Sequence, residues 1–334
     1  MSQIPREVLT PITQAMNEGA LTRRELKMLM RRSDVPAFLH LLLFFLVLLG
    51  TGSLIWATMG SWLVIPAMFL HGIVWVHHFS LQHECVHYTA FRTRWLNELV
   101  GNYCGLAILL PNRFFRYEHC DHHTYTQLHG RDPELIELPI SLGRYLSYVS
   151  SIPYWFQKFL EFGRHLAGRL TPEEEQFIPK EDRASIIIEV RAMAAVYAAI
   201  LGASAYFGWW GVLWYWLLPL FLGEPVMRAI RMTEHVGRPN VQDMTENTRT
   251  NLVSRPMRFL CWNMNYHAEH HYASSVPFHA LPELHRKLQG FVHVEDRGYL
   301  GAHIDILSQI VGRTPRLGTT ASETHEAVSG ASGS

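Results

Sequence analysis

The chain has 334 residues and a formal net charge of zero, and its charged fraction of 17% is below the ~25% typical of soluble domains. The balanced charge excludes the basic surface of a nucleic-acid-binding protein, so no nucleic acid partner is expected. Apolar residues make up 48% of the chain, and the missing charge is concentrated in two long stretches.

The chain begins with a basic, polar segment, residues 1–34, in which no cleavable signal peptide is visible. The first uncharged stretch comes next, from Val35 to His83, and contains no Lys, Arg, Asp or Glu. A helix needs about 20 apolar residues to cross a membrane. This stretch therefore predicts two spans, residues 35–57 and 62–79, joined at Met59-Gly60-Ser61. Buried helices of soluble proteins rarely lack charge over such a length.

The middle of the chain is less apolar. Residues 96–110 are hydrophobic but too short to span, so we expect an interfacial or re-entrant segment. A cytosolic segment at 112–188 precedes the second uncharged stretch, residues 192–223. This stretch predicts spans at 190–207 and 212–230. The residues from 312 to 334 are rich in Gly, Ser, Thr and Ala and predict a disordered tail, which leaves one membrane domain at 35–311.

Basic residues indicate how the spans are oriented. The N-terminal segment carries Arg23, Arg24 and Lys27, whereas neither hairpin tip carries Lys or Arg. Positive charge favours the cytosolic side, and four spans return the chain to the side on which it starts. We therefore predict an all-α, multi-pass integral membrane protein of a bacterial inner membrane or the endoplasmic reticulum. Its four transmembrane helices form two hairpins, both termini are cytosolic, and a cytosolic helical cap holds a set of histidine clusters.

Eight histidines form three clusters with helical spacing. Residues at positions i, i+3 and i+4 share one face of a helix, so each cluster directs its imidazoles toward one point. All three clusters directly follow predicted spans or lie between them on the cytosolic side, so we expect them to meet. The clusters are His83 and His87; His119, His122 and His123; and His267, His270 and His271.

The number of histidines predicts more than one metal ion. Imidazole suits iron, zinc, copper and nickel, and a single zinc site uses about four ligands in all. Eight converging histidines therefore suggest two metals held between helices. His235 lies just after the fourth predicted span and is our candidate for a ninth ligand. The alternative for His235 is a lone histidine at the membrane interface.

Four polar residues near the clusters are candidates for supporting the metal ligands. Asp121 and Glu269 each precede a His-His pair but point about 200° away from the first histidine of their cluster. They and Glu84 are expected to orient a histidine on a neighbouring helix, the alternative being a solvated or salt-bridged acid. Asn263, one turn before His267, is a candidate for holding a metal-bound water. We predict no catalytic side chain beyond the metal ligands.

Two other kinds of protein fit part of this pattern. Residues 83–87 match the zinc protease motif H-E-x-x-H, but this interpretation leaves six clustered histidines unexplained. A metal transporter would place its ligands near the middle of the bilayer, whereas these clusters lie outside the uncharged stretches. Both alternatives therefore explain less of the sequence than a di-metal site.

The three clusters also carry a family resemblance. The sequences His83-x-x-x-His87, His119-x-x-His122-His123 and His267-x-x-His270-His271 resemble the three histidine boxes of the membrane fatty acid desaturase superfamily. Their placement is similar too, with two boxes between the spanning pairs and one after them. The segment 277–285 is similar to the residues that come after the third box in that superfamily. The resemblance covers about residues 35 to 290.

The resemblance implies a non-haem site with two iron ions, which reduces dioxygen and attacks an unactivated C–H bond. The implied reaction introduces a double bond into a fatty acyl or similar alkyl chain, and a hydroxylase or other oxygenase on the same scaffold is the alternative. No fused cytochrome b5 motif and no ferredoxin-type cysteine run is present. The implied partners are therefore a lipid or acyl substrate and an external electron donor, either ferredoxin or cytochrome b5 with its reductase.

Overall fold

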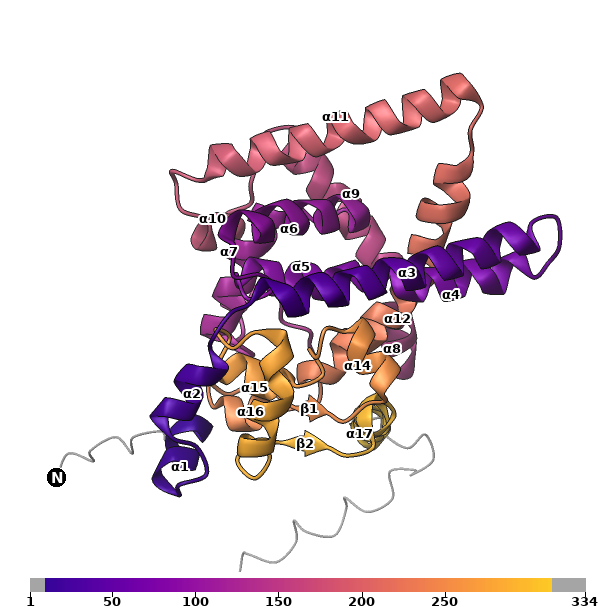
Figure 1. Cartoon of the computed structure of the whole chain (residues 1–334). Coiled ribbons are helices and arrows are strands. Elements are labelled where there is room, and N and C mark those ends of the chain that lie inside the picture. Colours follow the sequence, from indigo (N-terminus) through magenta and orange to yellow (C-terminus); the bar gives the residue numbers. More distant parts are fainter. Residues whose placement is uncertain (1–9, 314–334) are drawn as a thin grey trace, which may run out of the picture.

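The computed structural model describes residues 10–313, most of which are helical (Figure 1). Within these residues, the extended pairing consists of two short parallel strands that place Thr250 opposite Val294 and Asn251 opposite Glu295. In chain order the elements are α1 (Pro11–Asn17), α2 (Arg23–Leu29), α3 (Asp34–Thr58), α4 (Val64–Val76), α5 (His78–Val86), α6 (Arg94–Ile108), α7 (Asn112–Tyr125), α8 (Leu142–Val149), α9 (Ile152–Leu166), α10 (Glu174–Phe177), α11 (Arg183–Phe207), the π-helix η1 (Leu213–Leu217), α12 (Leu218–His235), α13 (Met244–Asn247), β1 (Thr250–Asn251), α14 (Arg255–Leu260), α15 (His267–Tyr272), the 3-10 helix η2 (Phe278–Ala280), α16 (Leu281–Leu288), β2 (Val294–Glu295) and α17 (Gly298–Arg313).

Three helices among the described residues are long and apolar enough to cross a membrane. They are α3, the combined length of α4 and α5 from Val64 to Val86, and α11. These three correspond to the predicted spans at 35–57, 62–79 and 190–207. The predicted fourth span, residues 212–230, falls on η1 and α12, where Glu224 and Arg228 interrupt the apolar sequence. A fourth span therefore stays a prediction, as does a cytosolic cap.

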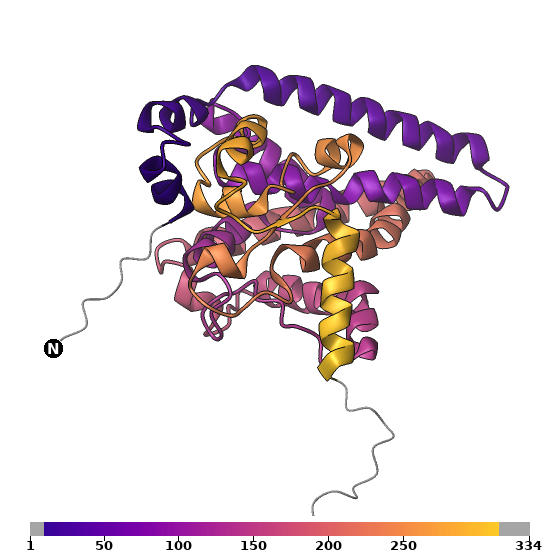
Figure 2. The ribbon, with the colours of Figure 1, turned by 90° about the horizontal axis from the view of Figure 1, so that it is seen from below.

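The first predicted hairpin is present. α3 and α4 run antiparallel and pack along each other (Figures 1 and 2). Gly60 lies in the turn between them with a φ of +81°, a conformation that glycine adopts without steric cost. The outer side of α3 is apolar and exposed, with Leu39, Leu42 and Leu46 each more than half accessible. Such a surface suits contact with lipid chains rather than with water.

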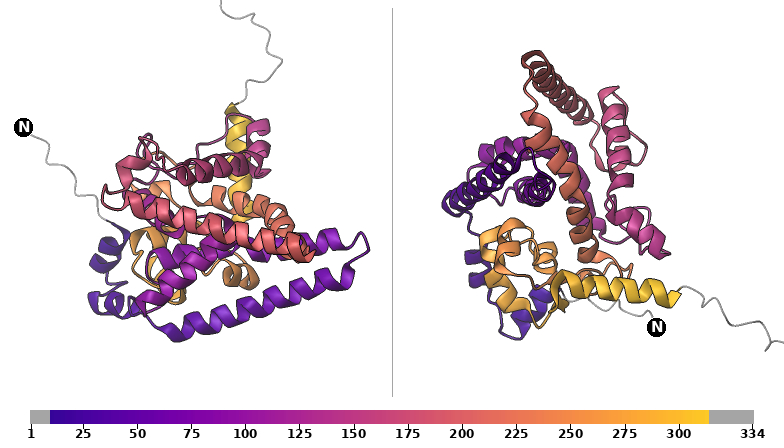
Figure 3. Two further views of the ribbon diagram at one scale, coloured as in Figure 1. Left: turned by 90° about the horizontal axis from the view of Figure 1, so that it is seen from above. Right: turned by 90° about the vertical axis from the view of Figure 1, so that its right-hand side faces the viewer.

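The second predicted hairpin stays a prediction, because the main partner of α12 is α4 rather than α11. α12 packs along α4, whereas α11 packs against α9 and α7 (Figures 1 and 3). The α4–α12 contact depends on two glycines that let the backbones touch. A Cβ atom on Gly72 would overlap the carbonyl oxygen of Pro219, and a Cβ atom on Gly223 would overlap that of Gly72. Small residues allow such close helix crossings, so α12 finds a better partner in α4 than in its neighbour in sequence.

α6 corresponds to the apolar segment expected at 96–110. It packs along α5 and ends at Leu109, whose φ of 60° reverses the chain. α6 is not among the helices long enough to cross a membrane. Because α7 follows after two residues, the reversal at Leu109 brings the second histidine cluster back beside α5.

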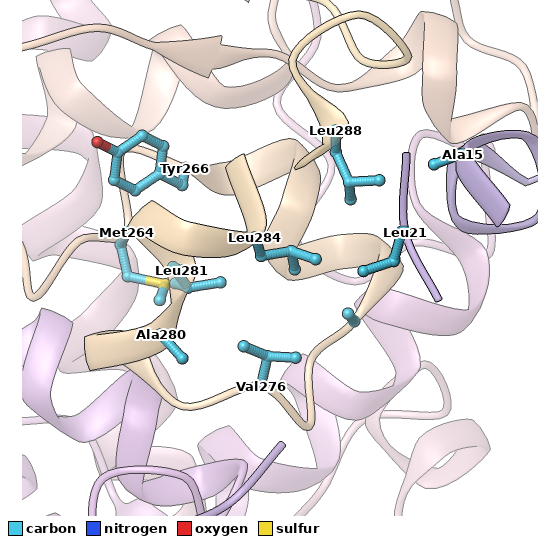
Figure 4. Packing of buried hydrophobic residues seen from close by; sticks show 10 residues of the cluster. Ala15, Leu21, Met264, Tyr266, Val276, Ala280, Leu281, Leu284 and Leu288 are labelled. Carbon is cyan, nitrogen blue, oxygen red and sulfur yellow. The ribbon is translucent and has the colours of Figure 1, made fainter. Parts of the chain in front are cut away.

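The C-terminal part of the chain packs with the N-terminal helices (Figures 1 and 2). Leu21, which precedes α2, is buried against Leu284 and Leu288 of α16 (Figure 4). The same hydrophobic cluster contains Met264 and Tyr266, the residues just before α15. This packing fixes the start of α15 and hence its three histidines. The predicted tail at 312–334 lies outside the described residues except for its first two, which end α17.

Candidate metal centre

Four helices supply the predicted metal ligands. α5 carries His83 near its end and is followed directly by His87, and α7 carries its three histidines in its last two turns. α15 consists largely of the third cluster, and His235 is the last residue of α12. Nearly every residue of α5 is buried, so its imidazoles face the interior of the protein.

The nine predicted histidines lie together. The ring of His83 is 4.3 Å from that of His119 and 4.6 Å from that of His270, measured between centroids. The ring of His235 is 4.8 Å from that of His267 and 5.1 Å from that of His122. All three clusters and His235 therefore face one another, although they come from four separate helices.

The histidines divide into two groups, in each of which one nitrogen per residue lies within 4.8 Å of all the others. We call them the first and the second group. Each group draws on more than one cluster, because His122 and His123 are neighbours in α7 but belong to different groups. The first group contains His83, His87, His119, His123 and His270; the second contains His122, His235, His267 and His271.

Hydrogen bonds at Nδ1 orient several of these rings. Nδ1 of His119 is 2.7 Å from Oε1 of Glu134, and Nδ1 of His122 is 2.8 Å from Oδ1 of Asp132. Nδ1 of His235 is 3.2 Å from the carbonyl oxygen of Asn247. Each of these oxygens accepts a hydrogen bond from Nδ1–H, which leaves the lone pair on Nε2. The Nε2 atoms of these three rings are therefore left as acceptors.

The spacing of these Nε2 atoms fits a bound cation. Nε2 of His267 lies 2.9 Å from that of His235 and 3.1 Å from that of His271. Nε2 of His123 lies 3.0 Å from that of His119. Since the Nε2 atoms of His119 and His235 are acceptors, a set of converging lone pairs calls for positive charge between them. Metal–nitrogen bonds of about 2.0–2.1 Å place neighbouring ligand atoms at such separations.

Other imidazole nitrogens lack a protein partner. In His83 neither ring nitrogen has one, and Nε2 of His87 also has none, although all three atoms are buried. A buried polar atom without a hydrogen-bond partner lowers the stability of the folded protein. These orphaned nitrogens in the first group are explained if they bind a metal, so the residues present fit the metal centre that the sequence predicts.

Burial keeps most of the cluster in the neutral form that binds metals. Burial, followed by the nearby His87 and His122, holds the pKa of His119 well below its ordinary value of 6.5. Burial and neighbouring histidines do the same for the pKa of His270. His122 differs: burial lowers its pKa, but the carboxylates of Glu134 and Asp132 raise it overall. Imidazole must be neutral to bind a metal.

The carboxylates that orient the ligands were not among the predicted ones. Asp132 and Glu134 lie in the loop after α7, and a turn containing Gly130 with a φ of +72° brings that loop back beside the helix. Glu134 also pairs with Arg231 of α12, with Nη2 and Oε2 2.5 Å apart. The sequence did offer a signal for these two residues: they are acids that closely follow the second cluster. A short turn can bring such acids back beside the helix that precedes them.

Two of the predicted supporting acids bind elsewhere. Glu84 accepts hydrogen bonds from the Thr89 hydroxyl at 2.9 Å and from the Phe278 backbone N–H at 3.1 Å. Glu269 accepts from Nδ1 of His285 at 2.6 Å and from the hydroxyl of Thr250. Neither carboxylate has a hydrogen bond to one of the nine histidines among the described contacts. Glu84 instead links α5 to the segment at Phe278, and Glu269 links α15 to β1 and α16.

The other two predicted supporting residues also face away from the histidines. Asp121 is partly exposed, and no hydrogen bond or ion pair of its side chain is found among the described residues. Asn263 donates from Nδ2 to the carbonyl oxygen of Phe278 at 3.0 Å, so it closes a turn. The predicted contact of Asp121 with a histidine is therefore not seen, and a metal-bound water held by Asn263 stays a prediction.

The position of Glu84 also bears on the protease motif at residues 83–87. A protease of that kind uses the glutamate as a general base at the metal. Here the Glu84 carboxylate binds Thr89 and the Phe278 backbone instead of facing the ring of His83 or His87. This geometry does not supply the base that the motif requires.

A small cavity lies between the two histidine groups. His83 and His119 of the first group line it, together with His122 and His267 of the second. Its volume is about 20 Å³, enough for one water-sized molecule. Glu234 also lines this cavity, and Oε2 of Glu234 is 3.9 Å from Nε2 of His267. A water-sized molecule in this cavity would contact histidines of both groups.

Comparisons with known proteins agree with this site. The profile of the family described as "Fatty acid desaturase" matches residues 60–300. An sn-1 oleoyl-lipid 12-desaturase of Anabaena variabilis is 22% identical over 71% of this chain and 74% of its own length. An sn-1 acyl-lipid omega-3 desaturase (ferredoxin) of Nostoc sp. is 26% identical over 48% of this chain and 46% of its own length.

A third relative, a probable fatty acid desaturase of Sorghum bicolor, is 30% identical over 57% of this chain and 51% of its own length. The family match takes in α4 to α16 and therefore all nine histidines. The matches and the candidate spanning helices identify an oxidoreductase of a membrane family. The chain belongs to the fatty acid desaturase family.

Proposed function

We propose that this chain is a dioxygen-dependent membrane desaturase with two iron ions, which introduces a double bond into a fatty acyl or similar alkyl chain. One observation carries the proposal: nine histidines from four helices form two adjacent groups, and within them the Nε2 atoms of six histidines approach one another. The names of the relatives, which are acyl-lipid and fatty acid desaturases, support the choice of substrate class.

The two groups would each hold one iron. The five histidines of the first group and the four of the second are the proposed ligands. Bound iron would supply one-electron redox chemistry with dioxygen, which an unactivated C–H bond requires because it offers neither an acidic proton nor an electrophile. Imidazole ligation is compatible with iron.

The surrounding residues would keep the ligands in place and the site dry. Glu134 and Asp132 fix the ring orientation of His119 and His122 through Nδ1. Phe79 and Met227 line the small cavity between the groups and would exclude bulk water. Arg231 balances the negative charge of Glu134 and Glu234, to which it pairs.

The proposed enzyme also needs a membrane topology and a source of electrons. We propose a fourth span at 212–230, with the histidine groups and both termini on the cytosolic side of a bacterial inner membrane or the endoplasmic reticulum. An external donor would supply electrons. Ferredoxin is supported by the printed name of the Nostoc relative, and cytochrome b5 with its reductase is the other candidate.

Metal content tests the site. Purified protein should contain about two iron ions per chain, as expected for separate histidine groups that each hold one ion. His122→Ala should lower the iron content, whereas the exposed His129 changed to alanine should not. Stoichiometric zinc in place of iron would overturn the proposal.

Product analysis tests the reaction. The protein would be expressed in a host with defined lipids, and lipids and small metabolites would be compared by mass spectrometry with those of a His122→Ala strain. Loss of two hydrogens from a lipid identifies a desaturase. A gain of one oxygen would contradict desaturation and identify a hydroxylase on the same scaffold.

A further inference from the structure

A chain of buried hydrogen bonds links two histidines of the second group. It runs from His235 through Thr248 and Asn247 to Thr126 and ends at His271. The three residues between the histidines are no more than 2% exposed. Thr126 directly follows α7, Asn247 ends α13, and the two histidines belong to α12 and α15. The chain therefore joins separate elements at a place where bulk water does not compete for its hydrogen bonds.

The bonds at His235 determine where its ring proton lies. Nδ1 of His235 is 3.2 Å from the hydroxyl oxygen of Thr248 and also 3.2 Å from the carbonyl oxygen of Asn247. The Thr248 hydroxyl is 2.6 Å from Oδ1 of the Asn247 side chain, an oxygen that can only accept. Thr248 therefore donates to Asn247, and the Thr248 oxygen accepts from Nδ1–H of His235.

The side-chain amide of Asn247 is itself oriented by two carbonyl groups. Nδ2 donates to the carbonyl oxygen of Val241 at 2.8 Å and to that of Thr126 at 3.1 Å. Because carbonyl oxygens only accept, these two bonds identify the amide nitrogen and leave Oδ1 to face Thr248. A further bond, from Nε2 of Gln127 to the carbonyl oxygen of His235 at 2.8 Å, holds the end of α7 beside the end of α12.

The bonds at His271 have the same direction. The hydroxyl of Thr126 is 2.7 Å from the carbonyl oxygen of His122, one turn earlier, so the hydroxyl donates to that carbonyl. Nδ1 of His271 is 3.2 Å from the same hydroxyl oxygen, which is left to accept from Nδ1–H. His235 and His271 therefore both carry their proton on Nδ1 and present the lone pair of Nε2 to the second group.

The first group has no comparable network. Among the described residues, His119 is its only member with a hydrogen bond at Nδ1. Nδ1 of His83 and Nδ1 of His270 are buried without a partner. Three of the four members of the second group have such a bond, namely His122, His235 and His271. The folded chain thus fixes the rings of the second group more completely than those of the first.

We propose that Thr126 and Thr248, linked by Asn247, are positioning residues of the second group. Their hydroxyl groups hold the ring protons of His271 and His235 on Nδ1, so that both Nε2 atoms are ready to bind a metal ion before it arrives. The inference rests on the proposed function, because that function supplies the iron. Partners of this kind orient a ligand and raise its basicity, and the hydroxyls do so without adding charge to the site.

Iron binding by the full-length protein tests the proposal. Thr126→Val removes the hydroxyl but keeps the size of the side chain. We expect the second group to bind iron about 10–100-fold more weakly, the range typical for loss of a partner that orients a metal ligand, and the first group to be unchanged. Mössbauer spectra distinguish the two, because the affected iron environment is the one that is lost in His235→Ala. Thr248→Val should weaken binding less, since Nδ1 of His235 keeps the Asn247 carbonyl.

Thr126→Ser and Thr124→Val are the matched controls. Serine keeps the hydroxyl and should bind iron as the wild type does. Thr124 is exposed on the same helix, and its hydroxyl also donates to a carbonyl four residues earlier, that of Cys120, at 2.9 Å. Thr124→Val should therefore leave both iron environments unchanged. Equal iron affinity in Thr126→Val and wild type, or binding as weak in Thr126→Ser as in Thr126→Val, would overturn the proposal.

The ring protons can also be located without a threonine variant. Nitrogen-15 NMR of histidine-labelled, metal-free protein separates protonated from unprotonated ring nitrogens, and His235→Gln and His271→Gln samples assign the two signals. We expect the proton on Nδ1 in both residues. A proton on Nε2 of either one would overturn the proposal, even if Thr126→Val does not fold. Wild-type protein that binds no iron would instead refute the proposed function, and the NMR result would still report on the network.

Discussion

Oε1 of Glu134 lies 2.7 Å from Nδ1 of His119, although Glu134 belongs to a loop and His119 to the helix before it. The other oxygen of the same carboxylate pairs with Arg231 of α12. One side chain thus joins the second histidine cluster to the helix that ends at His235. The orientation of a proposed ligand in the first group depends on this bridge.

Glu134→Gln should therefore weaken metal binding. The amide lacks the negative charge that orients His119 and leaves Arg231 with one partner fewer. Loss of a partner of this kind typically costs about 10–100-fold in metal affinity, and we expect that range in iron titrations of metal-free protein. Glu137→Gln is the control, because Glu137 is exposed and pairs with the exposed His129. Equal iron affinity in the two variants would contradict the role of Glu134.

His235→Ala should affect one histidine group more than the other. His235 belongs to the second group, which has four histidines against five in the first. We expect the iron content to fall from about two to about one per chain, because three remaining ligands leave an incomplete site. Mössbauer spectra would show which of two iron environments is lost. An unchanged spectrum would remove His235 from the proposed ligands.

Gly72→Ala should destabilise the crossing of α4 and α12. The added Cβ atom would overlap the carbonyl oxygen of Pro219, and overpacking of this kind typically costs about 1–3 kcal/mol. Thermal unfolding in detergent should show a lower midpoint together with reduced iron content. Gly50→Ala is the matched control, because a Cβ atom on Gly50 meets nothing within 4 Å. Similar midpoints for the two variants would show that the crossing tolerates extra volume.

Metal-free protein should become less stable as the pH falls below about 6.5. Burial lowers the pKa of His119, His267 and His271 well below their ordinary value of 6.5. At these histidines the unfolded chain binds more protons than the folded one, so their contribution to the free energy of unfolding decreases as the pH falls below about 6.5. Urea unfolding of chelator-treated protein between pH 8 and about pH 5.5 measures this slope.

His271→Gln should make that slope shallower, since one buried titrating group is removed. His129→Gln is the comparison, because His129 is exposed. A slope that is the same in wild type and in His271→Gln would show that the buried histidines do not control the pH dependence.

The sequence was sufficient to find all nine histidines, for a physical reason. Within each cluster the spacing is local, and a helix converts spacing into a common direction. The assignment of His235, which has no neighbour of its own kind, depended on its place after an apolar stretch. The structure brings all nine together, while their role as metal ligands stays a proposal.

The same reasoning failed where contacts are not local. Glu84 and Glu269 stand beside histidines in the sequence but bind Thr89 and His285 in space. Glu134, which does hold a histidine, lies in a loop without periodicity, where spacing predicts no direction. The partner of α12 could not be predicted either, because its contact with α4 is decided by the match between Gly72 and Gly223 across the interface.

The glycine contact between α4 and α12 also sets a length. His235 lies twelve positions after Gly223, which at 1.5 Å per residue is about 18 Å along the helix axis. Inserting one residue in this interval would turn His235 by about 100° away from its group. The number of residues between the crossing and the end of α12 therefore determines whether His235 reaches its group.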